Sequence, residues 1–217
     1  MLVRDRMSSP CLTIGPETPV QEALAQMHKD KVRRYPVVDK RGHLLGVVSM
    51  SDLLNATPSD ATLLSVWEVN YLLSKLTVEK VMTKDVITIT EDTPIEEAAR
   101  IMADHKIGGL PVVRGEEVVG IITETNLFKA FLELLGARYP GLRVSVLVED
   151  TPGKLNALTG AIYKAGGDII ALGTFAGDST ATSKLTFKLD NVNREAIEAA
   201  ISPLVVRILD IREVKIV

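Results

Sequence analysis

The chain has 217 residues, of which 46% are hydrophobic and 24% are charged, with a formal net charge of −3. This length accommodates one large domain or two to three small ones, with enough apolar residues to fill their cores. A small negative net charge and basic residues without interleaved aromatics give no reason to expect nucleic acid as a partner. A single cysteine, Cys11, excludes an internal disulfide, and the apolar runs are too short to cross a bilayer. We therefore expect a cytoplasmic protein with no membrane partner.

An internal repeat organises the first part of the chain. When residues 3–38 are shifted by 75 positions onto residues 78–113, 13 of the 36 positions are identical. After a one-residue deletion near Gly42, the stretch "GVVSMSD" falls on "GIITETN", so that Asp52 is matched by Asn126. The repeat predicts two copies of one small unit, at residues 1–55 and 78–133.

Each copy predicts the same order of elements, β-α-β-β-α. In the first copy, "ETPVQEALAQM" predicts a helix with Thr18 as its N-cap, Pro19 at its first position and Gln21 completing a capping box. In the second copy, "DTPIEEAARIM" predicts the same helix start with Thr93 and Pro94. Two short strands and a second helix follow in each copy, and the second helix is expected to start after Asp52 or Asn126.

The remaining segments connect the copies or follow them. Residues 56–77 carry apolar side chains at helical spacing and predict a helical linker, and residues 134–141 predict a second linker. From residue 142 onward, the pattern predicts the order β-α-β-β-α-β of a ferredoxin-like unit over residues 142–217. The expected fold class is therefore mixed α and β (α+β).

The duplicated motifs resemble those of a known family. Two units with "YPVV" or "LPVV", followed by "GVVSMSD" or "GIITETN", are similar to a tandem pair of CBS domains (a Bateman module). The segment "EDTPGKL" between the first strand and helix of the tail resembles an ACT domain. A CBS pair followed by an ACT domain is similar to the acetoin-utilisation type of CBS–ACT protein.

The resemblance implies a regulatory adenosine nucleotide in the clefts of the CBS pair, with no other cofactor. Asp52 suits a ribose, because a carboxylate can accept hydrogen bonds from both ribose hydroxyls, whereas Asn126 offers one acceptor and one donor group. The hydroxyl residues of the motif lie at a helix start, where backbone N–H groups can donate hydrogen bonds to a phosphate. The implied nucleotide-binding residues are Leu12, Val32, Arg33, Arg34, Tyr35, Ser49, Ser51, Asp52, Ile87, Ile107, Thr123, Thr125 and Asn126.

The two clefts are expected to differ. The first copy has Arg33 and Arg34 before its "YPVV", where the second copy has Gly108 and Gly109 before its "LPVV". In related CBS pairs, a basic residue at this place reaches the phosphate in the cleft of the other copy. The resemblance therefore pairs Arg33 or Arg34 with the Asn126 cleft and leaves Asp52 facing two glycines.

The ACT resemblance implies a small effector, such as an amino acid, bound in the tail. The implied effector-binding residues are Asp150, Pro152, Gly153, Leu155 and Asp168. Both kinds of module commonly pair with a second copy, so we expect a homodimer. A separate metabolic enzyme is an expected partner.

Three functions compete at this point. The first is a sensor without catalysis, which binds a nucleotide in the CBS clefts and an effector at the ACT domain. The second is an enzyme, or the regulatory subunit of one, although the modules leave no catalytic constellation and the three histidines lack metal-ligand spacing. The third is a structural dimerisation adaptor with empty clefts, in which the repeated hydroxyl and Asx residues are ordinary helix caps stabilising by about 1 kcal/mol.

Overall fold

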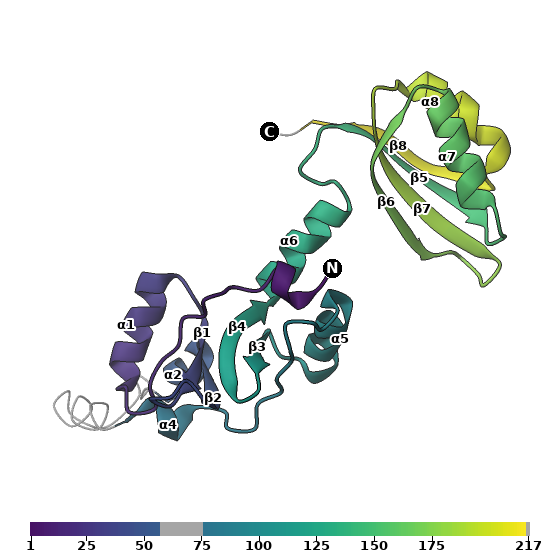
Figure 1. The fold of residues 1–217 in the computed structure, drawn as a ribbon. Coiled ribbons are helices and arrows are strands. Elements are labelled where there is room, and N and C mark those ends of the chain that lie inside the picture. The colour runs from purple at the N-terminus through teal and green to yellow at the C-terminus, as the bar shows by residue number, and fades with distance from the viewer. Residues whose placement is uncertain (57–75, 216–217) are drawn as a thin grey trace. The chain divides into compact units, whose positions relative to one another are not determined.

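A computed structural model describes residues 1–56 and 76–215 of the chain and divides it into two compact units, residues 1–127 and 128–217 (Figure 1). The second unit begins within a helix, before the linker expected at residues 134–141. Most of the helical linker expected at residues 56–77 lies outside the described residues. Among the described residues, no helix has the length and apolar character needed to cross a membrane.

The two sequence copies fold alike. The first contains η1 (Val3–Asp5), α1 (Val20–Asp30), β1 (Arg34–Val38), β2 (Leu44–Ser49) and α2 (Met50–Asn55). The second contains α4 (Val78–Val81), α5 (Ile95–His105), β3 (Gly109–Arg114), β4 (Glu117–Thr123) and α6 (Glu124–Leu134). In each copy the two strands form an antiparallel hairpin, and the register shifts at the same place, between the two valines of "PVV".

Two expectations about the elements of these copies need correction. The leading strand of each copy is reduced to one parallel bridge, Ile14 with Val37 and Ile89 with Val112, because the chain turns directly afterwards. The helices α2 and α6 start three residues earlier than expected, so Asp52 and Asn126 lie in their first turns.

The predicted capping boxes of α1 and α5 do not form. Pro19 and Pro94 occupy the N-cap positions, and neither helix receives a hydrogen bond from a capping side chain. Instead, the N–H of Val20 donates to the carbonyl oxygen of Leu76, and that of Ile95 donates to the carbonyl oxygen of Met1. A backbone oxygen from a segment distant in sequence thus takes the place of the threonine side chain.

Those distant segments are exchanged between the copies. Residues 1–9 lie at the start of the first copy but bond to the second, where Val3 N–H donates to the Thr93 carbonyl at 2.9 Å and Ser8 pairs with Ile121. Residues 76–83 lead into the second copy but bond to the first, where Val78 N–H donates to the Thr18 carbonyl at 2.9 Å. The two sets of bonds follow the same pattern, so the copies are joined symmetrically.

The exchange extends into the cores. Val3 is fully buried among α5, β3 and β4 of the second copy, and Val78 is fully buried among α1, β1 and β2 of the first. Each core therefore lacks one of its apolar side chains until the other copy's leading segment is in place. Burying a valine contributes on the order of 1.5–3 kcal/mol, so neither copy is expected to be stable alone.

The glycine of the repeated motif is explained by this crossing. A Cβ atom at Gly46 would lie 2.7 Å from the backbone oxygen of Thr83 and 2.8 Å from the sulfur of Met82. At Gly120, the corresponding distances are 3.1 Å to the oxygen of Ser8 and 2.6 Å to the sulfur of Met7. The exchanged backbone passes directly over each glycine, which leaves no room for a side chain.

The second unit has the predicted β-α-β-β-α-β order. Its elements are β5 (Gly141–Glu149), α7 (Lys154–Lys164), β6 (Asp168–Ala176), β7 (Thr182–Asp190), α8 (Arg194–Ile201), η2 (Ser202–Leu204) and β8 (Arg207–Val214). The strands form one antiparallel sheet in the order β6-β7-β5-β8. Both helices cover one face of this sheet (Figure 1), and the core between them contains Leu142, Val146, Leu158, Phe187 and Ile197.

The crossing at the repeated glycines generates a prediction. Gly46→Ala should lower the free energy of unfolding by roughly 1–3 kcal/mol, because the new methyl group meets backbone that cannot rotate away. Gly120→Ala should cost less, since its nearest neighbour is the flexible side chain of Met7. Gly160→Ala in α7 is the matched control: nothing lies within 4 Å of its added methyl group, so it should stabilise the protein slightly.

Urea unfolding of the full chain measures all three. An unchanged midpoint for Gly46→Ala would show that the crossing tolerates a side chain.

Candidate nucleotide-binding clefts

The hydroxyl and Asx residues of the first copy's motif bond to each other at the start of α2. Ser49 is the N-cap, and Asp52 occupies the third position of the helix. One carboxylate oxygen of Asp52 accepts from the backbone N–H of Ser49 at 2.8 Å and from its hydroxyl at 2.7 Å. Within the part of the chain that the structure describes, no group donates a hydrogen bond to the other carboxylate oxygen, Oδ1. The carboxylate therefore keeps acceptor capacity for a ligand.

The motif of the second copy has an additional partner. The side-chain oxygen of Asn126 accepts from the N–H of Thr123 at 2.9 Å and from its hydroxyl at 2.7 Å, as Asp52 does with Ser49. The amide nitrogen of Asn126 also donates to the carbonyl oxygen of Arg6 at 2.9 Å. A carboxylate could not make this bond. The change from Asp to Asn between the copies therefore has a structural reason, because the amide holds the exchanged N-terminal segment.

Arg34 crosses from the first copy to the second. Its guanidinium lies against the backbone of the two glycines, so that a Cβ atom at Gly108 would be 2.5 Å from one of its nitrogens and a Cβ atom at Gly109 would be 2.9 Å from another. The two glycines thus make room for this arginine. Burial lowers the pKa of the Arg34 guanidinium, while the nearby carboxylates of Glu124 and Asp52 act in the opposite direction.

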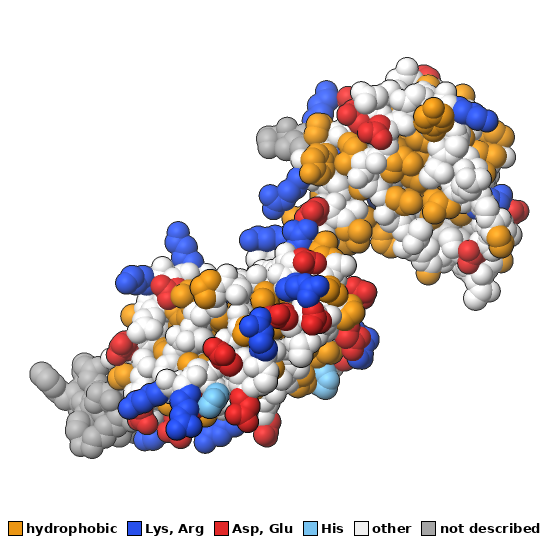
Figure 2. All heavy atoms as spheres, viewed as in Figure 1, with side chains coloured by type: hydrophobic (Ala, Val, Ile, Leu, Met, Phe, Trp, Pro, Cys, Tyr) orange, Lys and Arg blue, Asp and Glu red, His pale blue; other side chains and the backbone are white. Residues whose placement is uncertain are grey.

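Glu124 was not among the residues predicted from the sequence. It opens α6, its N–H donates to the Gly108 carbonyl at 3.3 Å, and its carboxylate lies near the guanidinium of Arg34. It occupies the position of Met50 in the first copy, so the two copies differ here in charge. The glutamate of "GIITETN", where "GVVSMSD" has a methionine, was the feature of the sequence that could have pointed to Glu124. Over the first unit as a whole, acidic and basic side chains are interspersed on the face visible in Figure 2.

The other polar residues predicted for the clefts lie at the surface. Arg33, Ser51 and Thr125 are exposed, and Ser51 and Thr125 sit in the first turns of α2 and α6. These three side chains are therefore accessible from solvent.

The residues expected to contact adenine have different surroundings. Tyr35 is only 1% exposed, and its hydroxyl donates to Asp30 at 2.7 Å, so it fills the first core and has almost no surface to offer a base. Burial and the Asp30 carboxylate raise the pKa of Tyr35. Leu12 is 53% exposed. The remaining three, Val32, Ile87 and Ile107, are partly buried at the edges of the two cores.

A separate cavity of about 390 Å³ contains the lone cysteine. It is lined by residues 9–11 of the N-terminal segment and by Val118 and Val119 near the start of β4. Thr123 ends that strand, so this cavity and the Thr123 motif are separated along β4. Burial raises the pKa of the Cys11 thiol to about 11, which leaves it uncharged at neutral pH.

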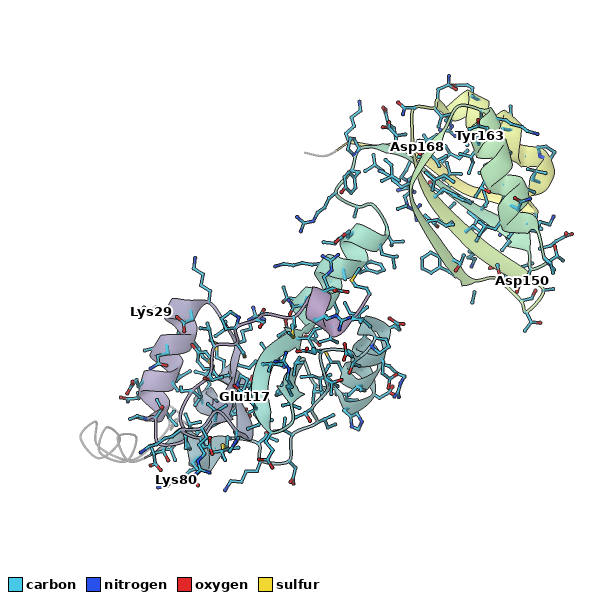
Figure 3. The ribbon with its side chains drawn as sticks, in the orientation of Figure 1. Lys29, Lys80, Glu117, Asp150, Tyr163 and Asp168 are labelled. Carbon is cyan, nitrogen blue, oxygen red and sulfur yellow. The ribbon has the colours of Figure 1, made fainter. Side chains whose placement is uncertain are left out.

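The effector residues predicted in the second unit are not brought together within one chain. Asp150, Pro152 and Gly153 are exposed in the loop after β5, and Leu155 is exposed in the first turn of α7. Asp168 begins β6. Its neighbour Ile169 pairs with Leu189, which pairs with Leu142 at the start of β5, so the start of β6 lies at the opposite end of the sheet from the loop after β5. Figure 3 shows Asp150 and Asp168 at opposite ends of this unit. A site that uses both would need a second chain.

The Asx residues of the two copies generate a reciprocal prediction. Asn126→Asp should destabilise the protein by roughly 1–3 kcal/mol, because it removes the donor to Arg6 and places a carboxylate against a carbonyl oxygen. Asp52→Asn is the matched change in the other copy and should cost less than 1 kcal/mol, since an amide oxygen can still accept from Ser49. Thermal unfolding of both variants tests this, and equal effects would contradict a special role for the Arg6 contact.

Comparison with known proteins identifies the repeated units. The family model for the CBS domain matches residues 3–59 and 78–133. Curated enzymes are among the relatives, and the chain spans only 22% to 32% of their length.

Three solved structures resemble the chain at similar levels. An acetoin utilization protein, AcuB, from Vibrio cholerae is 31% identical, covers 64% of this chain and 95% of its own, and has a TM-score of 0.53. The CBS domain pair of protein MJ0100, in complex with 5′-methylthioadenosine and S-adenosyl-L-methionine, is 30% identical, covers 64% of this chain and 98% of its own, and has a TM-score of 0.52. CBSX2 of Arabidopsis thaliana in complex with AMP is 31% identical, covers 61% and 97%, and has a TM-score of 0.53.

The duplicated hairpins, the paired hydroxyl and Asx motifs and the family match over both copies agree with one another. The chain belongs to the CBS-domain family and carries two CBS domains in tandem.

Proposed function

We propose that the chain is a regulatory sensor that binds an adenosine nucleotide in the clefts of its CBS pair. The observation that carries this proposal is the placement of Arg34, a partly buried cation laid across Gly108 and Gly109 with carboxylates near it. An arginine that loses hydration in this way is suited to a phosphate or another anion. The complexes of related CBS pairs with AMP and with S-adenosyl-L-methionine support an adenosine ligand.

In this proposal the residues of the clefts have different roles. Asp52 accepts hydrogen bonds from the ribose hydroxyls, because one of its oxygens is not used by the helix cap. Arg34 contacts the phosphate, and Glu124 limits how much negative charge the cleft accepts. Asn126 is a weaker ribose ligand than Asp52, because its amide already bonds to Arg6. Ser51 and Thr125 supply further hydroxyls at the cleft surface.

The wider regulatory role is also part of the proposal. The β-α-β-β-α-β order of the second unit and its "EDTPGKL" segment support an ACT domain, and the likeness to AcuB supports a link to acetoin utilisation. We propose a homodimer that controls a separate metabolic enzyme, with an effector such as an amino acid at the second unit. Binding in the first unit would act on the second through α6, which continues from one unit into the other.

A structural adaptor remains the second candidate, and one observation favours it. Both Asx side chains already make hydrogen bonds without any ligand, Asp52 with Ser49 and Asn126 with Thr123 and Arg6. In that case the motifs cap helices and fasten the exchanged segment, and dimerisation is the protein's role.

Calorimetric titration of the full chain with AMP and with adenosine separates these candidates. Arg34→Gln should weaken AMP binding by about tenfold or more and leave adenosine binding nearly unchanged, because only AMP carries the phosphate. Asp52→Asn should weaken both ligands by about tenfold, since both have the ribose diol. Arg41→Gln is the control, an exposed arginine in the β1–β2 turn with the same change in charge.

The control variant should bind both ligands as the unaltered chain does. If the folded protein gives no heat with either ligand, the result would contradict the sensor function and support the structural adaptor.

A further inference from the structure

The sheet of the second unit has one face that the helices do not cover, and its side chains are arranged in cross-strand rows. One row joins Lys188, Arg143 and Arg212 across β7, β5 and β8, and the next joins Thr186 and Ser145. A third row joins Phe175, Lys184, Leu147 and Arg207 across all four strands. These residues alternate with those of the core, so they all project from the uncovered face.

A groove of about 440 Å³ lies on this face. Its lining includes three cationic side chains, Arg143, Lys184 and Arg207. Its floor is the hydroxyl pair of Ser145 and Thr186, whose oxygens are 2.8 Å apart. We refer to this site as the open-face groove.

In the groove itself, cations outnumber carboxylates, because its lining has three cationic side chains and one carboxylate, that of Asp178. The carboxylate of Asp178 is shared by Lys184 at 2.7 Å and Arg207 at 3.5 Å. The carboxylate of Asp210 is shared by Arg143 at 2.9 Å and Arg212 at 2.8 Å. Four cations therefore share two acids, and like charges directly opposite one another in a sheet destabilise it.

Lys188 adds a further cation beside Arg143. Lys188 is 4% exposed, Gly136 after α6 packs against its side chain, and its ammonium group donates to the carbonyl oxygen of Gly141 at 3.4 Å. Burial and the neighbouring charge of Arg143 lower the pKa of Lys188.

The groove also has an apolar side. Phe175 is 46% exposed and Leu209 is 37% exposed, and both line the groove next to its cations. Gly173 lies between Ala171 and Phe175 on the same face, and the side chains of Leu135 and Phe175 pack against it. An aromatic ring and a leucine beside several cations and two hydroxyls match a ligand with one charged end and one apolar end.

We propose that the open-face groove binds a small organic carboxylate with an apolar body. The carboxylate would meet Arg207 and Lys184 over the hydroxyls of Ser145 and Thr186, and the apolar body would lie on Phe175 and Leu209. This site differs from the loop at Asp150–Leu155 and does not depend on nucleotide binding by the first unit.

Phenylacetate and its neutral analogue phenylacetamide test the proposal on the full chain. Phenylacetate should bind saturably and shift the backbone amide resonances of Ser145, Phe175 and Thr186, whereas phenylacetamide should bind at least tenfold more weakly. The double variant Lys184→Gln/Arg207→Gln should weaken phenylacetate binding at least tenfold and remain folded, because both side chains are partly exposed at the rim.

The matched control is Lys164→Gln/Arg194→Gln, which removes the same charge from exposed positions on α7 and α8 of the same unit. It should bind phenylacetate as the unaltered chain does. The proposal is overturned if phenylacetate gives no saturable binding up to about ten millimolar. It is also overturned if the amide binds equally well, or if both double variants lose binding to the same extent.

Discussion

The exchange of leading segments between the two CBS domains is the constraint on which the first unit depends. Val3 completes the core of the second domain and Val78 completes the core of the first, and backbone bonds at Ser8 and Thr83 fasten each segment to the other domain's hairpin. Because each core is finished by residues from the start of the opposite domain, neither domain is expected to be stable without the other. The geometry of the clefts depends on this arrangement, because Arg34 can contact Gly108 and Gly109 only when the two domains are held together.

The same constraint explains most of the repeated motif. Its glycine leaves room for the crossing backbone, and its hydroxyl and Asx residues form the first turn of a helix. The difference between Asp52 and Asn126 then separates two roles: the amide fastens the exchanged segment at Arg6, and the carboxylate keeps an oxygen for a ligand. A motif that serves the fold in both copies can therefore serve a ligand mainly in one.

The sequence predicted the duplication, both hairpins, the order of elements in the second unit and the asymmetry of the arginine and glycine pairs, because these leave local patterns. It did not predict the exchange of the leading segments between the copies. The predicted threonine caps do not form, because the N–H groups at the helix starts donate instead to the carbonyl oxygens of Met1 and Leu76. Tyr35 was expected to contact a base but is buried, and Asp168 was assigned to the same effector site as Asp150 although β6 begins at the other end of the sheet. The role of Glu124 required Arg34 to be placed beside it.

Native-state hydrogen exchange on Val3→Ala and Val78→Ala tests the exchange most directly, because each substitution removes buried methyl groups from one core only. Val3→Ala should reduce protection mainly in α5, β3 and β4, which lie far from it in sequence, and Val78→Ala should reduce protection mainly in α1, β1 and β2. The account would be contradicted if Val3→Ala loosened the first domain more than the second, since each leading segment would then belong to its own domain.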